Sequence, residues 1–233
     1  MKTYIGTKRL NAEPMTKGEA YDRSLLRGEI VEAERETHGY HVVYPDGYES
    51  WSPKDVFEDV YCVAETPLDC INIEYQDLDN KVGKIAQFKQ TETYNNLREV
   101  DRACLDVQFN IMQNYLGILG NRAISMKTGD GGLCGFDFGI ARYLLTHGYV
   151  LRRNSWNGKG VVVFKQVPAT INDEIIPKMQ SLPAKAKEVI LNGVKHIDYT
   201  SQCLIYNRMT GRADSWVPSI SDVFAEDWEL VIE

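Results

Sequence analysis

The sequence predicts an α+β protein of three modules: a small N-terminal α+β module at residues 1–66, a central helical hairpin at residues 71–123, and a C-terminal antiparallel-sheet domain with a short N-terminal helix at residues 130–233. Three observations support this fold class. The first module contains a hairpin signature, the second has apolar residues at helical spacing, and the third alternates short apolar runs with glycine-containing turns. The content of 43% hydrophobic and 25% charged residues is ordinary for a folded protein.

The N-terminal module is recognised by two aromatic, β-branched runs, Tyr40–Tyr44 and Tyr48–Trp51, on either side of Pro45-Asp46-Gly47. Two such runs around a Pro-Asp-Gly turn predict a β-hairpin. Pro53 then stands where it suits the first turn of a helix, so a short helix is expected at Lys54–Phe57.

The central module shows two amphipathic helical patterns, which the segment Gln90–Asn96 is expected to join into an antiparallel hairpin. Such a hairpin cannot bury its apolar face alone. The face must pack on another module, on its copy in a second chain, or within the core of its own chain, and the sequence leaves these alternatives open. The apolar stripes consist of Ile71, Leu78, Val82 and Ile85 in the first helix, and of Leu97, Val100, Cys104, Val107, Ile111, Tyr115 and Ile118 in the second.

The C-terminal domain is predicted to start with a helix that Asp137 caps and that ends at His147-Gly148. A strand, a tight polar turn and a second strand follow. Residues 166–200 interrupt the domain and contain one further helix, Ala184–Leu191. The remaining strands are expected at Cys203–Tyr206, near Ser215-Trp216 and at Trp228–Ile232, with a short helical turn at Ser221–Phe224.

The tight turn of this domain, Arg152 to Gly160, carries the most informative run of the chain, Trp156-Asn157-Gly158-Lys159-Gly160. Its glycines allow a positive φ and a close approach of the backbone to a ligand. Successive free N–H groups in such a turn can hold an anion, and Arg153 and Lys159 add positive charge beside it. An exposed indole next to these donors suits a nucleotide, with a base to stack and phosphates to hold. The alternative is a plain hairpin that the tryptophan caps.

The net charge of −7 is unevenly distributed along the chain. Residues 1–80 contain 8 Lys and Arg against 17 Asp and Glu, whereas residues 130–233 contain 11 against 12. The acidic front disfavours binding of a polymeric nucleic acid, which needs clustered basic charge. The C-terminal part can still hold a small anion, because a few local cations suffice.

The cellular setting expected from the sequence is a reducing cytoplasm. No run approaches the roughly 18 apolar residues of a membrane span, and the polar start at Met1-Lys2 does not resemble a signal peptide. The five cysteines are scattered, odd in number and without a Cys-x-x-Cys pair, which favours free thiols over disulfides.

No pattern in the sequence supports catalysis. The four histidines form neither a His-x-Thr pair nor a His-x-x-x-His metal motif. The sequence also lacks a Gly-x-Ser-x-Gly nucleophile elbow and a Gly-x-x-x-x-Gly-Lys-Ser/Thr phosphate loop. We therefore expect no catalytic residue, no metal site and no cofactor.

Three separated motifs in the C-terminal domain occur in the order of a known family. They are Phe138-x-x-Ala141-x-x-x-Leu145-x-x-Gly148, Arg153-x-x-Trp156-Asn157-Gly158-Lys159-Gly160 and Trp216-x-x-Ser219-x-Ser221-Asp222-x-x-Ala225-Glu226-Asp227-Trp228. Together they resemble the second type of Thoeris anti-defence protein, a small bacteriophage domain, over most of residues 136–233. The chain departs from the family in the length of residues 166–200 and in Ser215, where the family commonly has proline, and both departures concern the rim of the pocket.

The resemblance implies a β-sheet domain assembled as a homo-oligomer, a dimer or a tetramer, with pockets between protomers. It also implies a non-catalytic role in the cytoplasm of the infected bacterial host. Such proteins capture a cyclic ADP-ribose isomer that an immune TIR enzyme makes, and some relatives capture cyclic dinucleotides, so that the downstream effector stays silent. The helical and N-terminal modules resemble phage small-protein modules of unknown function. Two alternatives remain open: a phage protein–protein interaction module and a cyclic-nucleotide hydrolase.

The residues and the resemblance together indicate how a nucleotide would be held. Trp156 would stack on a base or close the pocket, and Lys159 would offset phosphate charge. Ser219 and Asp222 either bind ribose hydroxyls or cap a helical turn, and Trp216 belongs either to the pocket or to the core. The expected ligand-binding residues are Arg153, Trp156, Asn157, Gly158, Lys159, Gly160, Trp216, Ser219, Ser221 and Asp222.

Overall fold

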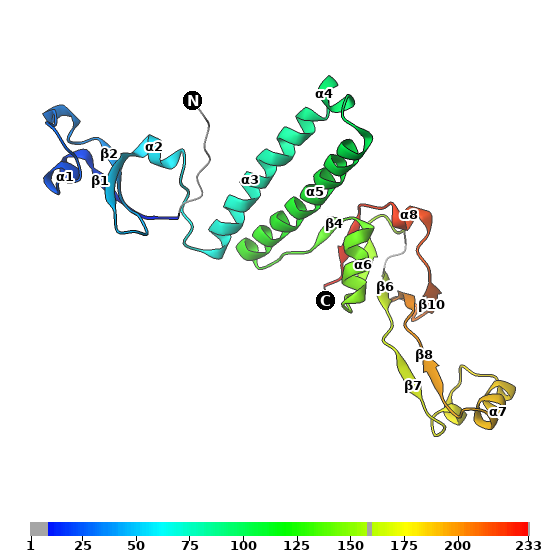
Figure 1. The fold of residues 1–233 in the computed structure, drawn as a ribbon. Helices are drawn as coiled ribbons and strands as arrows, with labels where there is room; N and C mark the ends of the chain where they lie inside the picture. The colour runs from blue at the N-terminus through cyan, green and yellow to red at the C-terminus, as the bar shows by residue number, and fades with distance from the viewer. Residues whose placement is uncertain (1–8, 158–159, 233) are drawn as a thin grey trace. The chain divides into compact units, whose positions relative to one another are not determined.

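The computed structural model describes residues 9–157 and 160–232, and Figure 1 shows the ribbon. The described residues form three antiparallel sheets, a helical central region and a C-terminal sheet domain, so the α+β fold class expected from the sequence is confirmed. The chain divides into two compact units, Met1–Glu65 and Thr66–Glu233. The second unit contains both the helical hairpin and the C-terminal sheet domain.

The first unit is a three-stranded antiparallel sheet with short helices. Strand β2 lies between β1 and β3. The β2–β3 hairpin turns at Pro45-Asp46-Gly47, as the sequence predicts, and Gly47 has a φ of +82°, which glycine adopts without a steric penalty. The elements are β1 (Asn11–Thr16), α1 (Lys17–Asp22), η1 (Glu32–Glu34), β2 (His38–Val43), β3 (Glu49–Pro53) and α2 (Lys54–Glu58).

A small core holds this sheet and its helices together. Met15, Ala20, Val42 and Phe57 are buried. The indole Nε1 of Trp51 donates a hydrogen bond to the carbonyl oxygen of Met15 at 2.9 Å. This bond links β3 to β1 across the central strand β2, so the two edge strands are tied by a side chain as well as by the ladder.

The central module is the expected antiparallel helical hairpin, and it extends beyond the predicted 71–123 segment at both ends, from Pro67 to Thr128. Helix α3 begins with a capping box, in which Thr66 Oγ1 accepts from the backbone N–H of Asp69 at 3.1 Å and Asp69 Oδ2 accepts from the N–H of Thr66 at 2.9 Å. Helix α5 ends at Gly129 in the left-handed conformation. None of the helices that the structure describes is long and apolar enough to cross a membrane. The elements are α3 (Pro67–Phe88), α4 (Glu92–Asn95) and α5 (Glu99–Thr128).

The C-terminal domain is built on a six-stranded antiparallel sheet with the order β10-β9-β6-β5-β11-β4. The last strand, β11, lies between β5 and β4, so the C-terminal end of the chain completes the sheet. The elements are β4 (Cys134–Phe136), α6 (Phe138–Thr146), β5 (Leu151–Arg153), β6 (Val161–Lys165), β9 (Cys203–Asn207), β10 (Ala213–Trp216), α8 (Ile220–Val223) and β11 (Trp228–Leu230).

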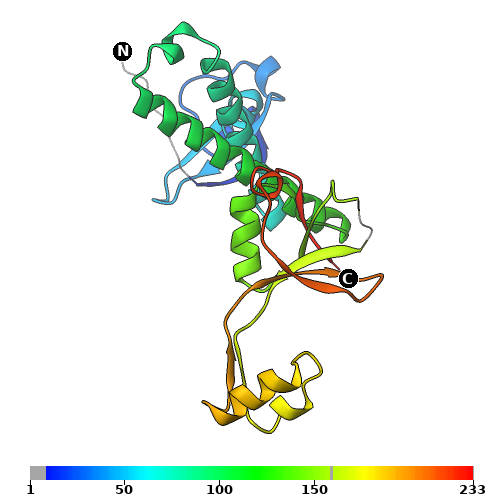
Figure 2. The ribbon, with the colours of Figure 1, turned by 90° about the vertical axis from the view of Figure 1, so that its right-hand side faces the viewer.

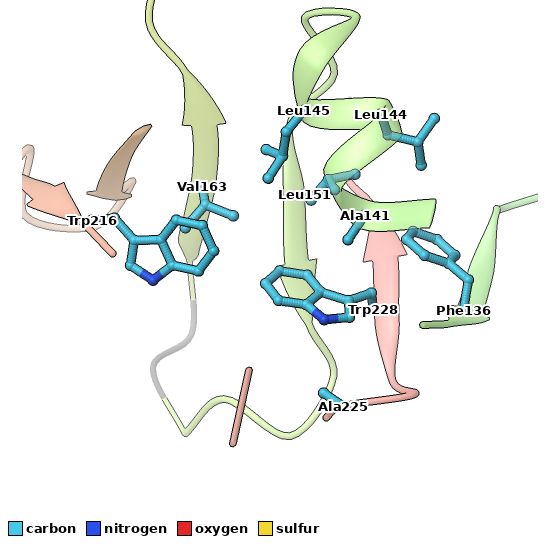
Figure 3. Packing of buried hydrophobic residues seen from close by; sticks show 9 residues of the cluster. All are labelled: Phe136, Ala141, Leu144, Leu145, Leu151, Val163, Trp216, Ala225 and Trp228. Atoms are coloured by element: carbon cyan, nitrogen blue, oxygen red, sulfur yellow. The ribbon is translucent and has the colours of Figure 1, made fainter. Parts of the chain in front are cut away.

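One core fills the space between this sheet and α6, and Figure 3 shows its side chains. Ala141 of α6 and Leu151, Val163 and Trp228 of the sheet are fully buried there. Asp137 starts α6 as predicted, because its Oδ1 accepts a hydrogen bond from the backbone N–H of Ile140 at 3.0 Å.

Asparagine side chains of α5 form hydrogen bonds with the start of the C-terminal domain. Asn114 Nδ2 donates to Asp137 Oδ2 at 3.0 Å, and Asn121 Nδ2 donates to the carbonyl oxygen of Cys134 at 3.2 Å. Asp137 therefore caps α6 with one carboxylate oxygen and accepts a hydrogen bond from Asn114 of α5 with the other.

Residues 166–200 form an arm between β6 and β9 (Figure 2). The backbone N–H of Gln166 donates to the carbonyl oxygen of Gln202 at 2.7 Å, which extends the pairing of β6 and β9 towards the arm. The arm leaves the end of β6 at Lys165, whereas the turn with Trp156 precedes the start of that strand. The insertion is therefore attached at the end of β6 opposite to the candidate turn. Its elements are β7 (Ala169–Ile171), η2 (Ile176–Lys178), α7 (Ala184–Asn192) and β8 (Ile197–Tyr199).

Candidate functional site

Asp227 holds the start of the turn that follows β5. Its Oδ2 accepts a hydrogen bond from the backbone N–H of Ser155 at 2.8 Å, and its carbonyl oxygen accepts one from the N–H of Asn154 at 3.0 Å. Arg153 Nε donates to the other carboxylate oxygen at 2.8 Å. These three contacts fix the first residues of the turn against the segment that leads into β11.

The guanidinium of Arg153 lies between two carboxylates. Its Nη1 donates to Asp222 Oδ1 at 2.9 Å and to the carbonyl oxygen of Ser221 at 3.1 Å, while its Nε binds Asp227. Only 14% of the Arg153 side chain is exposed. The hydrogen bond with Asp227 is the largest of the effects that raise the pKa of Arg153, so the side chain stays charged.

Both carboxylates are ionised at neutral pH. Burial raises the pKa of Asp222, but hydrogen bonds from Ser219 and Arg153 outweigh this effect and lower the pKa overall. Burial also raises the pKa of Asp227, but hydrogen bonds from Ser155 and Arg153 lower it to about 2. One guanidinium between two carboxylates leaves a formal charge of −1. In this geometry Arg153 pairs with both carboxylates and ties the start of the turn to α8 and to the segment before β11.

Trp156 is half-buried rather than exposed at the mouth of the turn as the sequence suggested. Its ring packs edge-to-face against Trp228 at 5.6 Å and against Trp216 at 6.5 Å between ring centroids. Its Nε1 donates to Asp222 Oδ1 at 3.3 Å. The indole packs on the apolar core, and its N–H is satisfied by the buried carboxylate of Asp222. The residue as a whole is packed against the core without being fully buried.

Ser219 and Asp222 form the cap of α8, which was one of the two roles expected for them. Ser219 Oγ accepts from the backbone N–H of Asp222 at 3.2 Å, and Asp222 Oδ2 accepts from the N–H of Ser219 at 2.9 Å. The hydroxyl groups of Ser219 and Ser221 lie 2.8 Å apart, and Ser221 is exposed. Trp216 is 9% exposed and belongs to the core.

Arg208, a cation that the sequence did not single out, is bonded to the far end of the turn. Gly160 has a φ of +88°, and its carbonyl oxygen accepts a hydrogen bond from the backbone N–H of Arg208 at 2.9 Å. Arg208 is exposed, and its guanidinium has no hydrogen-bond or ion-pair partner within the described part of the chain. It lies in the β9–β10 turn, close to 50 residues further on, and no local pattern in the sequence connects it with Gly160.

The structure thus brings most of the expected ligand-binding residues to one region. Arg153, Trp156, Ser219 and Asp222 form a connected hydrogen-bond network, with Ser221 at its surface. Asn157 is exposed at the edge of the described chain, and Gly158 and Lys159 lie outside the described residues. Among the residues described here, no group of three His, Cys, Asp or Glu side chains is arranged to hold a metal ion.

The surface next to this network is apolar. Val217, Ile220 and Phe224, in and on either side of α8, flank Ser219 and Ser221 in the sequence and are 82%, 80% and 81% exposed. Three large apolar side chains that are this exposed within eight residues are unusual for a surface that faces only water.

Two family models match the chain, and a comparison with curated proteins finds no match. Residues 65–125, which cover α3 and most of α5, match the model named Sequestin. Residues 136–231 match the Thoeris anti-defense 2-like domain. This second match begins at Phe136 in β4, contains every motif quoted above and supports a Thoeris anti-defence role. The C-terminal region of the chain, residues 136–231, therefore carries a Thoeris anti-defense 2-like domain, as its motifs indicated.

Proposed function

We propose that the C-terminal domain binds a cyclic nucleotide immune signal and sequesters it without cleaving it, in the cytoplasm of an infected bacterial host. The signal is a cyclic ADP-ribose isomer from a TIR enzyme or a cyclic dinucleotide. The match of residues 136–231 supports this proposal, and the Sequestin match of residues 65–125 is compatible with it. The structural observation that carries it lies at the two ends of the turn: Asp227 holds Asn154 and Ser155 just before Trp156, and the exposed Arg208, whose guanidinium has no partner among the described residues, bonds through its backbone N–H to Gly160.

The network beneath the turn prepares the site and does not itself bind the nucleotide. Asp222 and Asp227 anchor Arg153, and Asp222 also orients Trp156. Because these groups are already paired, a ligand need not order them on binding. Preorganisation of this kind raises affinity by lowering the entropy that binding costs.

We propose that the nucleotide is contacted by groups that this network does not already pair. The ring of Trp156 would stack on a base, and Arg208 with Lys159 would bind phosphate oxygens. Ser221 and Asn157 would bind ribose hydroxyls or base edges. A nanomolar dissociation constant corresponds to about −12 kcal/mol, which stacking and several charge-assisted hydrogen bonds in an enclosed site can reach.

The exposed apolar residues in and beside α8 support assembly of the domain. We propose that Val217, Ile220 and Phe224 are covered by a second protomer in a dimer or tetramer, so that the nucleotide lies between chains. An enclosed site excludes water and strengthens each polar contact, which a single shallow surface cannot do.

Recovery of the bound nucleotide tests the proposal directly. The protein is incubated with the cyclic ADP-ribose isomer, separated from free ligand and heat-denatured, and the released compound is identified. Intact recovery supports sequestration, and an altered product would show catalysis. No uptake, either of this compound or of a panel of cyclic dinucleotides, would favour the alternative of a protein–protein interaction module.

A matched pair of variants then tests the assigned contacts. Arg208→Gln removes the unpaired cation beside Gly160, whereas Arg212→Gln removes a neighbouring guanidinium that is already paired with Asp214 at 2.7 Å. We expect the first variant to weaken uptake at least tenfold and the second to change it little.

A further inference from the structure

The turn between β9 and β10, residues 208–211, lies against the far end of the candidate turn that follows β5. The backbone N–H of Arg208 donates to the carbonyl oxygen of Gly160 at 2.9 Å. A Cβ atom at Gly160 would stand 3.0 Å from Met209 Cγ and 3.6 Å from Arg208 Cβ. Because Gly160 has no side chain, the side chains of Arg208 and Met209 can lie directly beside its backbone.

Asn207 fixes the backbone of this β9–β10 turn. Its side-chain Oδ1 accepts hydrogen bonds from the N–H groups of Met209 at 2.8 Å and Thr210 at 3.3 Å. Its carbonyl oxygen accepts one from the N–H of Gly211 at 2.9 Å, and Gly211 has a φ of +72°. Asparagine stabilises turns by bonding to the backbone of the residues that follow it. The turn is therefore ordered by its own contacts and needs no ligand to shape it.

Met209 stands on this ordered turn and is 77% exposed. It does not belong to the hydrophobic core of the domain, so core packing does not account for a large apolar side chain at this position. A methionine side chain has several rotatable bonds and a polarisable sulfur, so it adapts its shape and makes favourable contacts with aromatic rings. Methionine is for this reason common on surfaces that bind more than one partner.

We propose that Met209 determines which nucleotides the site accepts, by packing its thioether against a base while Arg208 binds a phosphate. In a nucleotide one ribose separates the base from the phosphate, and two long neighbouring side chains can contact both groups. Both residues lie beside Gly160, which places these contacts on the same side of the candidate turn. This inference rests on the proposed function, to which it adds a residue that discriminates between bases.

The shape of the side chain at this position should set the selectivity. An unbranched methionine can adjust to bases with different ring substituents, whereas a β-branched residue has a restricted χ1 and fits fewer of them. Met209→Ile should therefore change the selectivity of the site. Met209→Leu, which has a similar volume and no branch at Cβ, should largely preserve it.

Calorimetry of the full chain against the cyclic ADP-ribose isomer and several cyclic dinucleotides measures this selectivity. We expect Met209→Ile to change the ratio of dissociation constants for the two best-bound nucleotides about three- to tenfold, the range of one sulfur–aromatic contact. Met209→Leu should keep the ratio within about twofold of the wild-type value. The matched control is Met126→Ile, at a 49% exposed position on α5. Thermal unfolding completes the test, because a residue with a merely structural role would shift Tm without changing the ratio.

Oxidation of the unaltered protein gives a direct readout of contact at Met209. Hydrogen peroxide transfers an oxygen atom to the sulfur of an exposed methionine and is itself reduced to water, and peptide mass spectrometry locates the sulfoxide. We expect a saturating nucleotide to slow the oxidation of Met209 severalfold and to leave that of Met126 unchanged.

The outcomes separate this inference from the proposed function. Oxidation of Met209 at the same rate with and without bound nucleotide would overturn the inference, and so would an unchanged ratio in Met209→Ile. In either case sequestration by the domain would stand. No uptake of any nucleotide by the wild-type chain would overturn the proposed function and this inference together.

Discussion

Arg153 and Asp222, 69 residues apart in the sequence, meet at 2.9 Å beneath the turn that follows β5. The same Asp222 oxygen accepts the indole N–H of Trp156, and the other oxygen caps α8. One carboxylate thus connects the turn to α8. Its position explains how Arg153 and Trp156, at the start of the turn, are held in place outside the sheet.

Removal of the guanidinium should destabilise the C-terminal domain. Arg153→Ala leaves Asp222 and Asp227 ionised and facing each other in a largely buried site. Because unpaired buried charges are costly, we expect a loss of about 2–3 kcal/mol in the free energy of unfolding, measured with denaturant. Arg152→Ala is the matched control, since its ion pair with Glu229 is 45% exposed on the arginine side and should cost less than about 1 kcal/mol. Equal effects of the two variants would contradict the role given to Arg153.

Stability of the same domain should fall at low pH. The pKa of Asp227 is lowered to about 2 in the folded chain, so the carboxylate stabilises the fold above its usual pKa near 4 and loses this contribution as pH falls through 2. Since the side chain is 31% exposed, we expect about 1 kcal/mol after solvent screening. Asp227→Asn should flatten the pH dependence of unfolding between pH 5 and 2. An unchanged slope in that variant would show that other carboxylates carry the effect.

The two roles of Trp156, packing and stacking, can be separated. Trp156→Phe keeps an aromatic ring but loses the hydrogen bond to Asp222, which should cost about 1 kcal/mol of stability and leave measurable uptake. Trp156→Ala removes the stacking surface and should weaken uptake roughly ten- to a hundredfold, as expected for the loss of one aromatic–base stack of about 1–3 kcal/mol. Circular dichroism and the mass in solution show whether the fold and oligomer persist. Uptake by the folded alanine variant at the wild-type level would exclude Trp156 from the site.

The first unit should lose stability as pH rises. His41 on β2 lies between two carboxylates, with Nε2 at 2.8 Å from Glu49 and Nδ1 at 3.2 Å from Glu13. The hydrogen bond with Glu49, followed by that with Glu13, raises the pKa of His41 above its usual value. The protonated ring therefore stabilises the sheet fully below about pH 6.5, and this contribution disappears as pH rises through the raised pKa. His41→Gln should remove the slope, which thermal unfolding of the first unit between pH 5 and 8 can measure.

The parts of the structure that follow local rules could be predicted from the sequence. The spacing of apolar residues identified the hairpin helices, Pro45-Asp46-Gly47 identified the first β-hairpin, and the three-residue separation of Ser219 and Asp222 indicated a cap. These features depend on residues a few positions apart.

The features that depend on the sheet order could not be predicted in the same way. In the sequence Arg153 resembles a free cation, because Asp222 and Asp227 are far from it along the chain. The pairing of β11 with β5 is what brings these carboxylates next to it. The sequence suggested that Trp156 is exposed, because its partners Trp216 and Trp228 belong to strands that lie much further along the chain. Arg208 was overlooked for the same reason, since pairing of β6 with β9 is what places it beside the turn.

The most direct test of the account is the fate of a cyclic nucleotide after capture by the purified full chain. Calorimetry against a cyclic ADP-ribose isomer and several cyclic dinucleotides gives the affinity, and heat release followed by identification of the compound gives its chemical state. We expect tight binding of at least one of these nucleotides, weakened at least tenfold by Arg208→Gln but not by Arg212→Gln, with the nucleotide recovered intact. Absence of binding to the whole panel, or recovery of a cleaved product, would contradict the account.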